Sequence, residues 1–158
     1  MPLHRKHLID VADFSRDEFE SVLDTAESMR QVLDRPISRV PTLRGKSIVN
    51  VFFEASTRTR VSFELAGKSL SADVVNIASS GSSVEKGESL VDTFHTIQAL
   101  GADLVVLRHP RAGAPDLAAR NLNCSVVNAG DGFRGHPTQA LLDLFTVQRH
   151  AGTKQHCL

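Results

Sequence analysis

Hydrophobic and polar positions alternate along the chain with two periods, one typical of strands and the other of helices. Short runs rich in apolar and β-branched residues predict four strands, at residues 47–53, 73–77, 103–107 and 125–128. Apolar residues that recur every three or four positions predict a helix after each strand, over residues 57–70, 88–100, 114–122 and 137–150. The sequence therefore predicts an α/β fold, a three-layer parallel sheet of about four strands with helices on both faces.

A further helix is predicted ahead of the first strand. Ser15 is placed to be its N-cap, and Glu18, three residues later, completes a capping box. Apolar residues follow at helical spacing until Pro36 ends the segment. Residues 1–150 are interpreted as one domain, and residues 151–158 as an atypical tail.

Charge and composition exclude several classes of protein. The 18 basic side chains equal the 18 acidic ones, which argues against a nucleic-acid-binding face. No apolar run is long enough to span a membrane, and the first residues lack the apolar core of a signal peptide. Cys124 and Cys157 have neither metal-ligand spacing nor a disulfide framework, and the histidines form no metal-binding pair. We therefore expect a cytoplasmic protein without a metal site, a nucleic-acid partner or a membrane anchor.

Polar clusters follow each of the four predicted strands. They lie at residues 56–60, 82–87, 108–110 and 136–139. In parallel α/β sheets, ligands bind outside the carboxyl ends of the strands. We therefore expect the four clusters to converge on one pocket.

The first cluster, Ser-Thr-Arg-Thr-Arg, has the chemistry of a phosphate site. A helix that begins near Ser56 offers free backbone N–H groups and a partial positive charge. The hydroxyls of Ser56, Thr57 and Thr59 add donors, and Arg58 can bind phosphate oxygens in bidentate fashion. The alternative is a helix capped by Ser56 with solvated arginines. Two arginines between hydroxyls, directly after an apolar strand, favour the phosphate site.

The other clusters each allow a functional and a purely structural interpretation. His136 and Gln139 lie three residues apart at a helix start, where they could bind a carbonyl oxygen and an amino group, or could simply cap and pack. Arg108 ends an apolar strand, where it could bind a ligand or pair with a nearby carboxylate. Lys86 lies in a Ser-rich loop, where the alternative is a solvated surface lysine.

Residues 130–135 match the Gly-x-Gly-x-x-Gly pattern of dinucleotide-binding folds. That pattern is expected after the first strand, with an acidic residue about 20 positions later. Here it follows the fourth strand, and Lys154 and Gln155 stand at that distance. The glycines are therefore better explained as shaping the loop that aims His136.

Taken together, these motifs resemble the carbamoyltransferase family. Residues 53–64, Phe-Glu-Ala-Ser-Thr-Arg-Thr-Arg-Val-Ser-Phe-Glu, resemble its carbamoyl-phosphate signature. Residues 83–88, 107–110, 128–132 and 136–139 resemble the aspartate carbamoyltransferases in particular. Ornithine carbamoyltransferases usually have Cys where this chain has Thr138. The resemblance runs from about residue 7 to about residue 150.

The resemblance implies a reaction. The carbamoyl group of carbamoyl phosphate would be transferred to L-aspartate, giving N-carbamoyl-L-aspartate and phosphate, a step that opens pyrimidine biosynthesis. It implies no cofactor, no metal and no covalent enzyme intermediate.

The resemblance also assigns roles to individual residues. Ser56, Thr57, Arg58 and Thr59 would hold the phosphate, and Thr59 would also lie near the carbonyl. Arg108 and His136 would polarise the carbonyl oxygen, and Gln139 would hold the carbamoyl amino group. The residues implied in catalysis are Arg58, Thr59, Arg108 and His136.

The resemblance further implies a homotrimer. Ser83, or its neighbour Ser82, and Lys86 would reach into the site of an adjacent subunit, where Lys86 also helps bind aspartate. Regulatory or other pyrimidine-pathway subunits are further partners that the family allows.

One part of the family pattern is missing. The family has a second α/β domain that supplies the arginines for aspartate, and one of them pairs with the counterpart of Glu54. We expect this chain to be a truncated, frameshifted or natural fragment that lacks the second domain and is inactive alone. The alternatives are a non-catalytic carbamoyl-phosphate-binding module and an ornithine-type carbamoyltransferase.

Overall fold

The computed structural model describes residues 3–78 and 89–151. Its centre is a sheet of four parallel strands in the order β2-β1-β3-β4. The strands are β1 (Ser47–Phe52), β2 (Asp73–Ala78), β3 (Leu104–His109) and β4 (Ser125–Asp131). The parallel sheet predicted from the alternating pattern is confirmed.

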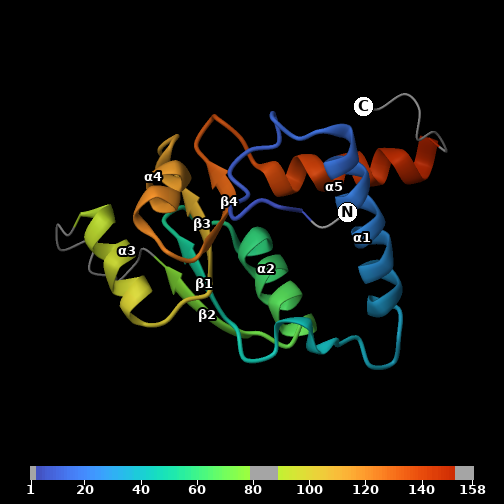
Figure 1. Ribbon diagram of the computed structural model, residues 1–158, viewed down its shortest axis with the longest axis horizontal. Coiled ribbons are helices and arrows are strands. Elements are labelled where there is room, and N and C mark those ends of the chain that lie inside the picture. The colour runs from blue at the N-terminus through green and yellow to red at the C-terminus, as the bar shows by residue number, and fades with distance from the viewer. Residues whose placement is uncertain (1–2, 79–88, 152–158) are drawn as a thin grey trace.

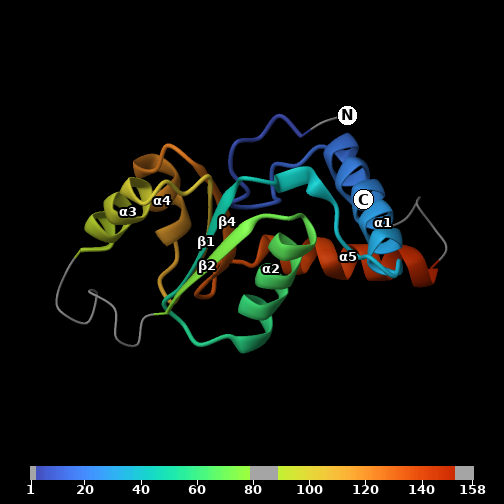
Figure 2. The same cartoon turned by 90° about the horizontal axis from the view of Figure 1, so that it is seen from below.

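Helices cover both faces of this sheet (Figures 1 and 2). Helices α3 (Leu90–Ala99) and α4 (Ala114–Asn121) lie on one face, and α2 (Thr57–Ser69) and α5 (Pro137–Ala151) lie on the other. Helix α1 (Arg16–Leu33) packs against α5, and a short 3₁₀ turn, η1 (Pro41–Leu43), leads into β1. The predicted three-layer architecture is confirmed. Among the described helices, none has the length and apolar character needed to cross a membrane.

Side chains that alternate along the strands form two hydrophobic cores. Val49 and Val51 point to the side of α3 and α4, where they meet Phe94, Ile97 and Ala118. The neighbouring strand residues Ile48 and Phe52 point to the side of α2. There they form a second cluster with Ala72, Val106 and Ala129. Because the central strands β1 and β3 are buried on both faces, they consist mainly of apolar residues.

Two helices begin with the same capping device. The Ser15 hydroxyl accepts from the Glu18 backbone N–H at 3.3 Å, and the Glu18 carboxylate accepts from the Ser15 N–H at 2.8 Å. This confirms the capping box predicted for α1. Ser89 and Asp92 form an equivalent box at α3, which places the start of that helix at Leu90, two residues later than predicted.

Strand β4 is longer than the sequence predicted. It was expected to end at Asn128, but it continues to Asp131. The register with β3 shifts between Leu107 and His109, so β4 carries an extra residue there and bulges. The Asn128 side chain donates to Asp131 Oδ1 and accepts from the Gly130 N–H. These bonds explain how Asn, Gly and Asp, which are typical of turns, remain in a strand.

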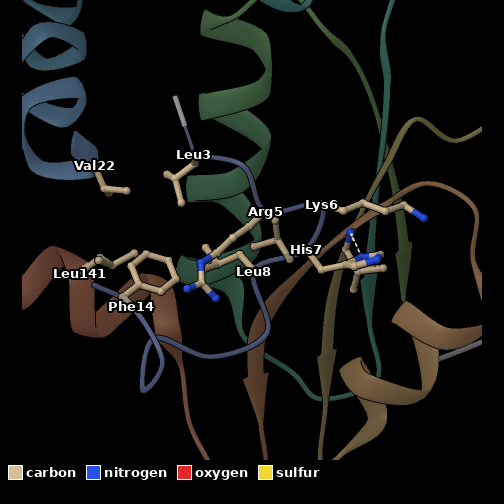
Figure 3. Close-up of a pocket in the computed structure, with 10 residues that line it drawn as sticks. Leu3, Arg5, Lys6, His7, Leu8, Phe14, Val22 and Leu141 are labelled. Atoms are coloured by element: carbon tan, nitrogen blue, oxygen red, sulfur yellow. Dashed lines mark hydrogen bonds between the residues drawn. The ribbon is translucent and has the colours of Figure 1, made fainter. Parts of the chain in front are cut away.

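The N-terminal segment lies along the outer edge of β4. Leu8 donates its N–H to Val126 O at 2.8 Å and accepts from Asn128 N at 2.8 Å, which makes a short parallel bridge. Residues of this segment, together with Phe14 and Leu141, line a pocket of about 200 Å³. Figure 3 shows these lining side chains. Arg5 lies 4.6 Å from the centre of the Phe14 ring and pairs with Glu18 at 2.6 Å. An aromatic cation contact and an ion pair therefore hold the segment against α1.

We expect His7 to make this attachment sensitive to pH. Its Nδ1 accepts from the Val126 N–H at 3.2 Å, and burial lowers the pKa of His7 below its ordinary value. A histidine with a lower pKa in the folded chain stabilises the fold while it is neutral. That stability is lost as pH falls from about 6.5 through the folded-state pKa. The free energy of unfolding in urea should therefore decrease between about pH 7 and pH 5.

The matched comparison is His7→Gln, whose amide oxygen can still accept from Val126 but does not titrate. This variant should show a shallower decrease over the same interval. Burial also lowers the pKa values of His109 and His136, so these residues contribute to the pH dependence as well. Their contribution is the same in both proteins, and the difference between the two slopes therefore reports His7. Equal slopes in the two proteins would contradict the assignment.

Candidate functional site

A groove of about 740 Å³ lies between α2 and α5, at the carboxyl ends of the strands. Six of the residues predicted for the ligand site line it, contributed by α2, β3 and the start of α5: Ser56, Arg58, Thr59, Arg108, His136 and Gln139. Thr57 opens α2 but is not part of the lining. Ser82, Ser83 and Lys86 lie outside the described residues. The structure thus brings three of the four predicted clusters together.

The first turn of α2 is open to a ligand. Ser56 holds the N-cap position, but its side chain makes no capping hydrogen bond. Its hydroxyl donates instead to the Thr59 hydroxyl at 2.9 Å. The alternative in which Ser56 caps the helix is therefore wrong, and the backbone N–H groups of the first turn remain available for an anion.

Arg58 adds a positive charge at the same place. It is exposed and lines the groove. Among the described residues, no carboxylate forms an ion pair with it. An uncompensated guanidinium beside an uncapped helix start is a favourable environment for phosphate.

Arg108 faces the groove because it lies on the α2 side of β3. Its Nη1 donates to Ala129 O at 3.0 Å, and its Nη2 donates to the Glu54 carboxylate at 2.7 Å. Its Nε is buried and has no partner among the described residues. The pairing with a nearby carboxylate, left open by the sequence, is therefore confirmed. Glu54 contacts Arg108 within the chain, whereas the resemblance pairs its counterpart with a second-domain arginine.

His109, the next residue, points to the opposite face. Its ring packs edge-on against Phe53 at a centroid distance of 5.1 Å, and its Nδ1 accepts from the Arg111 N–H at 2.9 Å. The alternation of side chains along β3 thus separates a groove residue from a packing residue.

Two glycines of the loop after β4 allow this arrangement. Gly130 has a φ of +117°, and a Cβ built on it would lie 2.6 Å from Arg108 Nη1. Gly132 has a φ of +60°, and its Cβ would lie 2.5 Å from Pro110 O. These two glycines therefore serve the close approach of β3 and its guanidinium to β4, rather than a pyrophosphate.

The same loop is anchored by buried polar side chains that the sequence analysis did not assign. Asn128 and Asp131 are both buried, and the Asn128 amide donates to Asp131 Oδ1 at 3.1 Å. Asp131 Oδ2 accepts from the Gly113 N–H at 3.0 Å. The signal for them was present in the Asn-Ala-Gly-Asp-Gly run, whose polar residues follow an apolar strand.

His136 and Gln139 lie where α5 begins. The His136 backbone carbonyl accepts from Gln139 N at 3.0 Å, so His136 also serves as the start of the helix. Its Nδ1 lies 3.2 Å from the Thr138 hydroxyl. Burial, together with the nearby Arg108 charge, lowers the pKa of His136. At neutral pH the groove therefore contains a neutral imidazole beside a guanidinium.

Residues 6–149 match the family model described as the aspartate/ornithine carbamoyltransferase carbamoyl-phosphate-binding domain. The chain belongs to this family. Within the described residues, no group of three or more His, Cys, Asp and Glu side chains could hold a metal ion.

Curated relatives within the carbamoyltransferase family are similar over nearly the whole chain. The aspartate carbamoyltransferase catalytic subunit of Roseiflexus sp. is 65% identical over 148 residues, which cover 94% of this chain and 46% of the relative. That of Chloroflexus aggregans is 61% identical over 152 residues, or 96% and 49%. The chain thus spans about half the length of the curated relatives it matches.

Solved carbamoyltransferase structures share the fold. An aspartate transcarbamoylase from Trypanosoma cruzi in complex with carbamoyl phosphate and aspartate is 36% identical, with a TM-score of 0.87. The match covers 94% of this chain and 46% of that one. The catalytic subunit of M. jannaschii aspartate transcarbamoylase is 46% identical, with a TM-score of 0.85 and coverage of 94% and 48%.

We expect Gly130→Ala to disturb ligand binding through Arg108. The added methyl group would displace the guanidinium, and loss of a charge-assisted contact costs about 1.5–3 kcal/mol. Calorimetric titration with carbamoyl phosphate should therefore show affinity lower by about tenfold or more.

The matched control is Gly113→Ala, which also has a positive φ, +84°, but meets no atom within 4 Å. Both variants carry backbone strain and should lower the melting temperature. Only Gly130→Ala should weaken binding. Equal affinities in the two variants would refute the proposed contact.

Proposed function

We propose that this chain is the carbamoyl-phosphate-binding half of an aspartate carbamoyltransferase. In this proposal residues 1–150 form the binding domain, and residues 151–158 a tail outside it. The observation that carries the proposal is the groove, where an uncapped helix start and Arg58 lie opposite Arg108, His136 and Gln139. This arrangement suits a ligand with a dianionic group at one end and a polar carbonyl at the other.

The phosphate would lie at the start of α2. Backbone N–H groups of the first turn, the hydroxyls of Ser56, Thr57 and Thr59, and the Arg58 guanidinium would bind its oxygens. The contact between the Ser56 and Thr59 hydroxyls holds both side chains near the helix start. Phosphate is also the leaving group, so the same contacts would stabilise the charge that develops on it.

The carbonyl oxygen would lie between Arg108 and His136. It gains negative charge in the tetrahedral transition state, and fixed donors that point at it lower the barrier. A neutral His136 can donate a ring N–H, because the Thr138 hydroxyl can satisfy Nδ1 and leave the proton on Nε2. Because Arg108 Nη2 already donates to the Glu54 carboxylate, a ligand that binds this nitrogen must compete with Glu54.

The second substrate would be L-aspartate. Its α-amine would attack the carbonyl carbon and form the C–N bond as the C–O bond to phosphate breaks, and the departing phosphate would take the proton. Catalysis would then depend on positioning and charge stabilisation. The T. cruzi relative that shares the fold was crystallised with both carbamoyl phosphate and aspartate, which supports this pair of substrates.

Assembly completes the proposal. We propose a cytoplasmic homotrimer in which Ser83 and Lys86 reach a neighbouring site and Lys86 contacts aspartate. The carboxylates of aspartate would be bound by arginines of the second half that the relatives carry.

The phosphate assignment predicts a large effect of Arg58→Ala. Loss of a bidentate charge-assisted contact should cost about 1.5–3 kcal/mol, or about ten- to a hundredfold in affinity for carbamoyl phosphate by calorimetry. Arg60→Ala is the matched control, because Arg60 lies on the same helix outside the groove lining. It should change affinity by no more than about threefold through screened charge. Equal losses would mean that the effect is one of general charge.

The catalytic assignment predicts that activity requires the second half. We expect this chain alone to bind carbamoyl phosphate but to produce no N-carbamoyl-L-aspartate. Addition of a separately produced second half from the Roseiflexus relative should restore turnover in a complex with the mass of three paired chains by light scattering. Turnover with ornithine in place of aspartate would support the ornithine-type alternative. Binding without turnover in either condition would leave a non-catalytic binding module.

A further inference from the structure

Gln139 forms a hydrogen bond with a carboxylate one turn along α5, and both side chains are exposed. Its Nε2 donates to Asp143 Oδ1 at 2.8 Å. Gln139 lines the groove, whereas Asp143 does not. Within the described part of the chain, this is the only side-chain hydrogen bond of Gln139. Asp143 is thus a group outside the groove that acts on a group inside it.

The chemistry of the pair decides which end of the amide faces a ligand. An ionised carboxylate only accepts hydrogen bonds, whereas an amide donates from nitrogen and accepts at oxygen. A reversed Gln139 would place its own oxygen against the Asp143 carboxylate, so the pair favours the orientation in which the NH₂ group faces Asp143. The carbonyl oxygen is then the atom available to a ligand.

That oxygen gives the groove a hydrogen-bond acceptor next to several donors. Arg58, Arg108 and a neutral His136 all offer N–H groups. A carbamoyl group has a carbonyl oxygen for those donors and an NH₂ group for the acceptor. An acetyl group of nearly the same shape has a methyl in place of the NH₂.

We propose that Asp143 is a positioning residue that makes the site selective for an acyl phosphate bearing an amino group. The proposal rests on the function proposed above. In this proposal, Asp143 orients the Gln139 amide so that its oxygen faces the ligand. That orientation favours carbamoyl phosphate over acetyl phosphate. A pair at i, i+4 also stabilises a helix, as Arg16 and Glu20 do on α1 at 3.0 Å. A purely structural pair would not affect the choice between two ligands.

The test is Asp143→Lys, which reverses the chemistry at this position. The ammonium group donates to the Gln139 oxygen and turns the NH₂ group toward the ligand. Affinities for carbamoyl phosphate, acetyl phosphate and inorganic phosphate are measured by calorimetry. One neutral hydrogen bond is worth about two- to tenfold in affinity, so the wild-type chain should prefer carbamoyl over acetyl phosphate by about that factor. In Asp143→Lys the ratio should fall to about one or below.

The ratio separates this effect from charge, because an added cation strengthens binding of all three phosphates alike. Glu20→Lys makes the same change of charge in an exposed helical pair away from the groove and should keep the wild-type ratio. Asp143→Glu retains an acceptor and should also keep it. Asp143→Asn, in which either amide orientation finds a partner, should lower the ratio partway, and it serves as the test if the lysine variant does not fold.

Each outcome bears on the proposal. A wild-type preference that survives Asp143→Lys or, if that variant does not fold, Asp143→Asn overturns the role of Asp143 and leaves the proposed function intact. A wild-type chain that binds the two acyl phosphates equally also overturns it. No binding of carbamoyl phosphate by the wild-type chain refutes the proposed function itself, and the role of Asp143 with it.

Discussion

The contact between the Arg108 guanidinium and the backbone of Gly130 determines how this end of the sheet is built. The guanidinium lies where a Cβ at position 130 would stand, and the φ of +117° at this position independently favours glycine. The bulge between β3 and β4 falls at the same level and supplies the extra residue that this close approach requires. Asn128 and Asp131 then fix the bulged chain, which continues to His136. The Arg108 guanidinium, the bulge and the buried Asn128 and Asp131 side chains thus meet at the end of the sheet that carries the groove.

Charge around the groove is distributed unequally in a chain whose formal net charge is zero. Arg58 has no carboxylate partner among the described residues, whereas Arg108 has Glu54. The two arginines are thus different: one is open to solvent at an uncapped helix start, and the other is largely buried and already paired. A buried cation without a partner is costly, so Glu54 stabilises the groove when no anion is bound. In the proposed function, a phosphate group would meet little competition at Arg58, whereas a carbonyl oxygen that binds Arg108 would compete with the Glu54 carboxylate.

Much of this could be predicted from the sequence, and the failures have physical reasons. The four strands and five helices follow from hydrophobic spacing, because a buried parallel sheet requires apolar runs. The extension of β4 could not be predicted, since Asn128, Gly130 and Asp131 are typical turn residues and only the bulge and their side-chain bonds keep them in the strand. The bridge of Leu8 to Val127 was missed because a single pair of backbone bonds leaves no periodic pattern. Six predicted site residues line one groove because they follow strand ends, but the pairing of Arg108 with Glu54 depends on distances between segments 54 residues apart.

The start of α5 places two polar side chains, His136 and Gln139, in the groove. Helix α5 begins at Pro137, so the His136 backbone carbonyl forms the start of the helix while its ring lines the groove, with Nδ1 near the Thr138 hydroxyl. One turn later, Gln139 is close enough to Asp143 for a carboxylate to orient its amide. Helical spacing thus places His136 and Gln139 in the lining of the same groove, where we propose that one donates a hydrogen bond and the other accepts one. In the proposed function, the carbamoyl group would bind to the start of α5 and the phosphate to the start of α2, on the two sides of the groove.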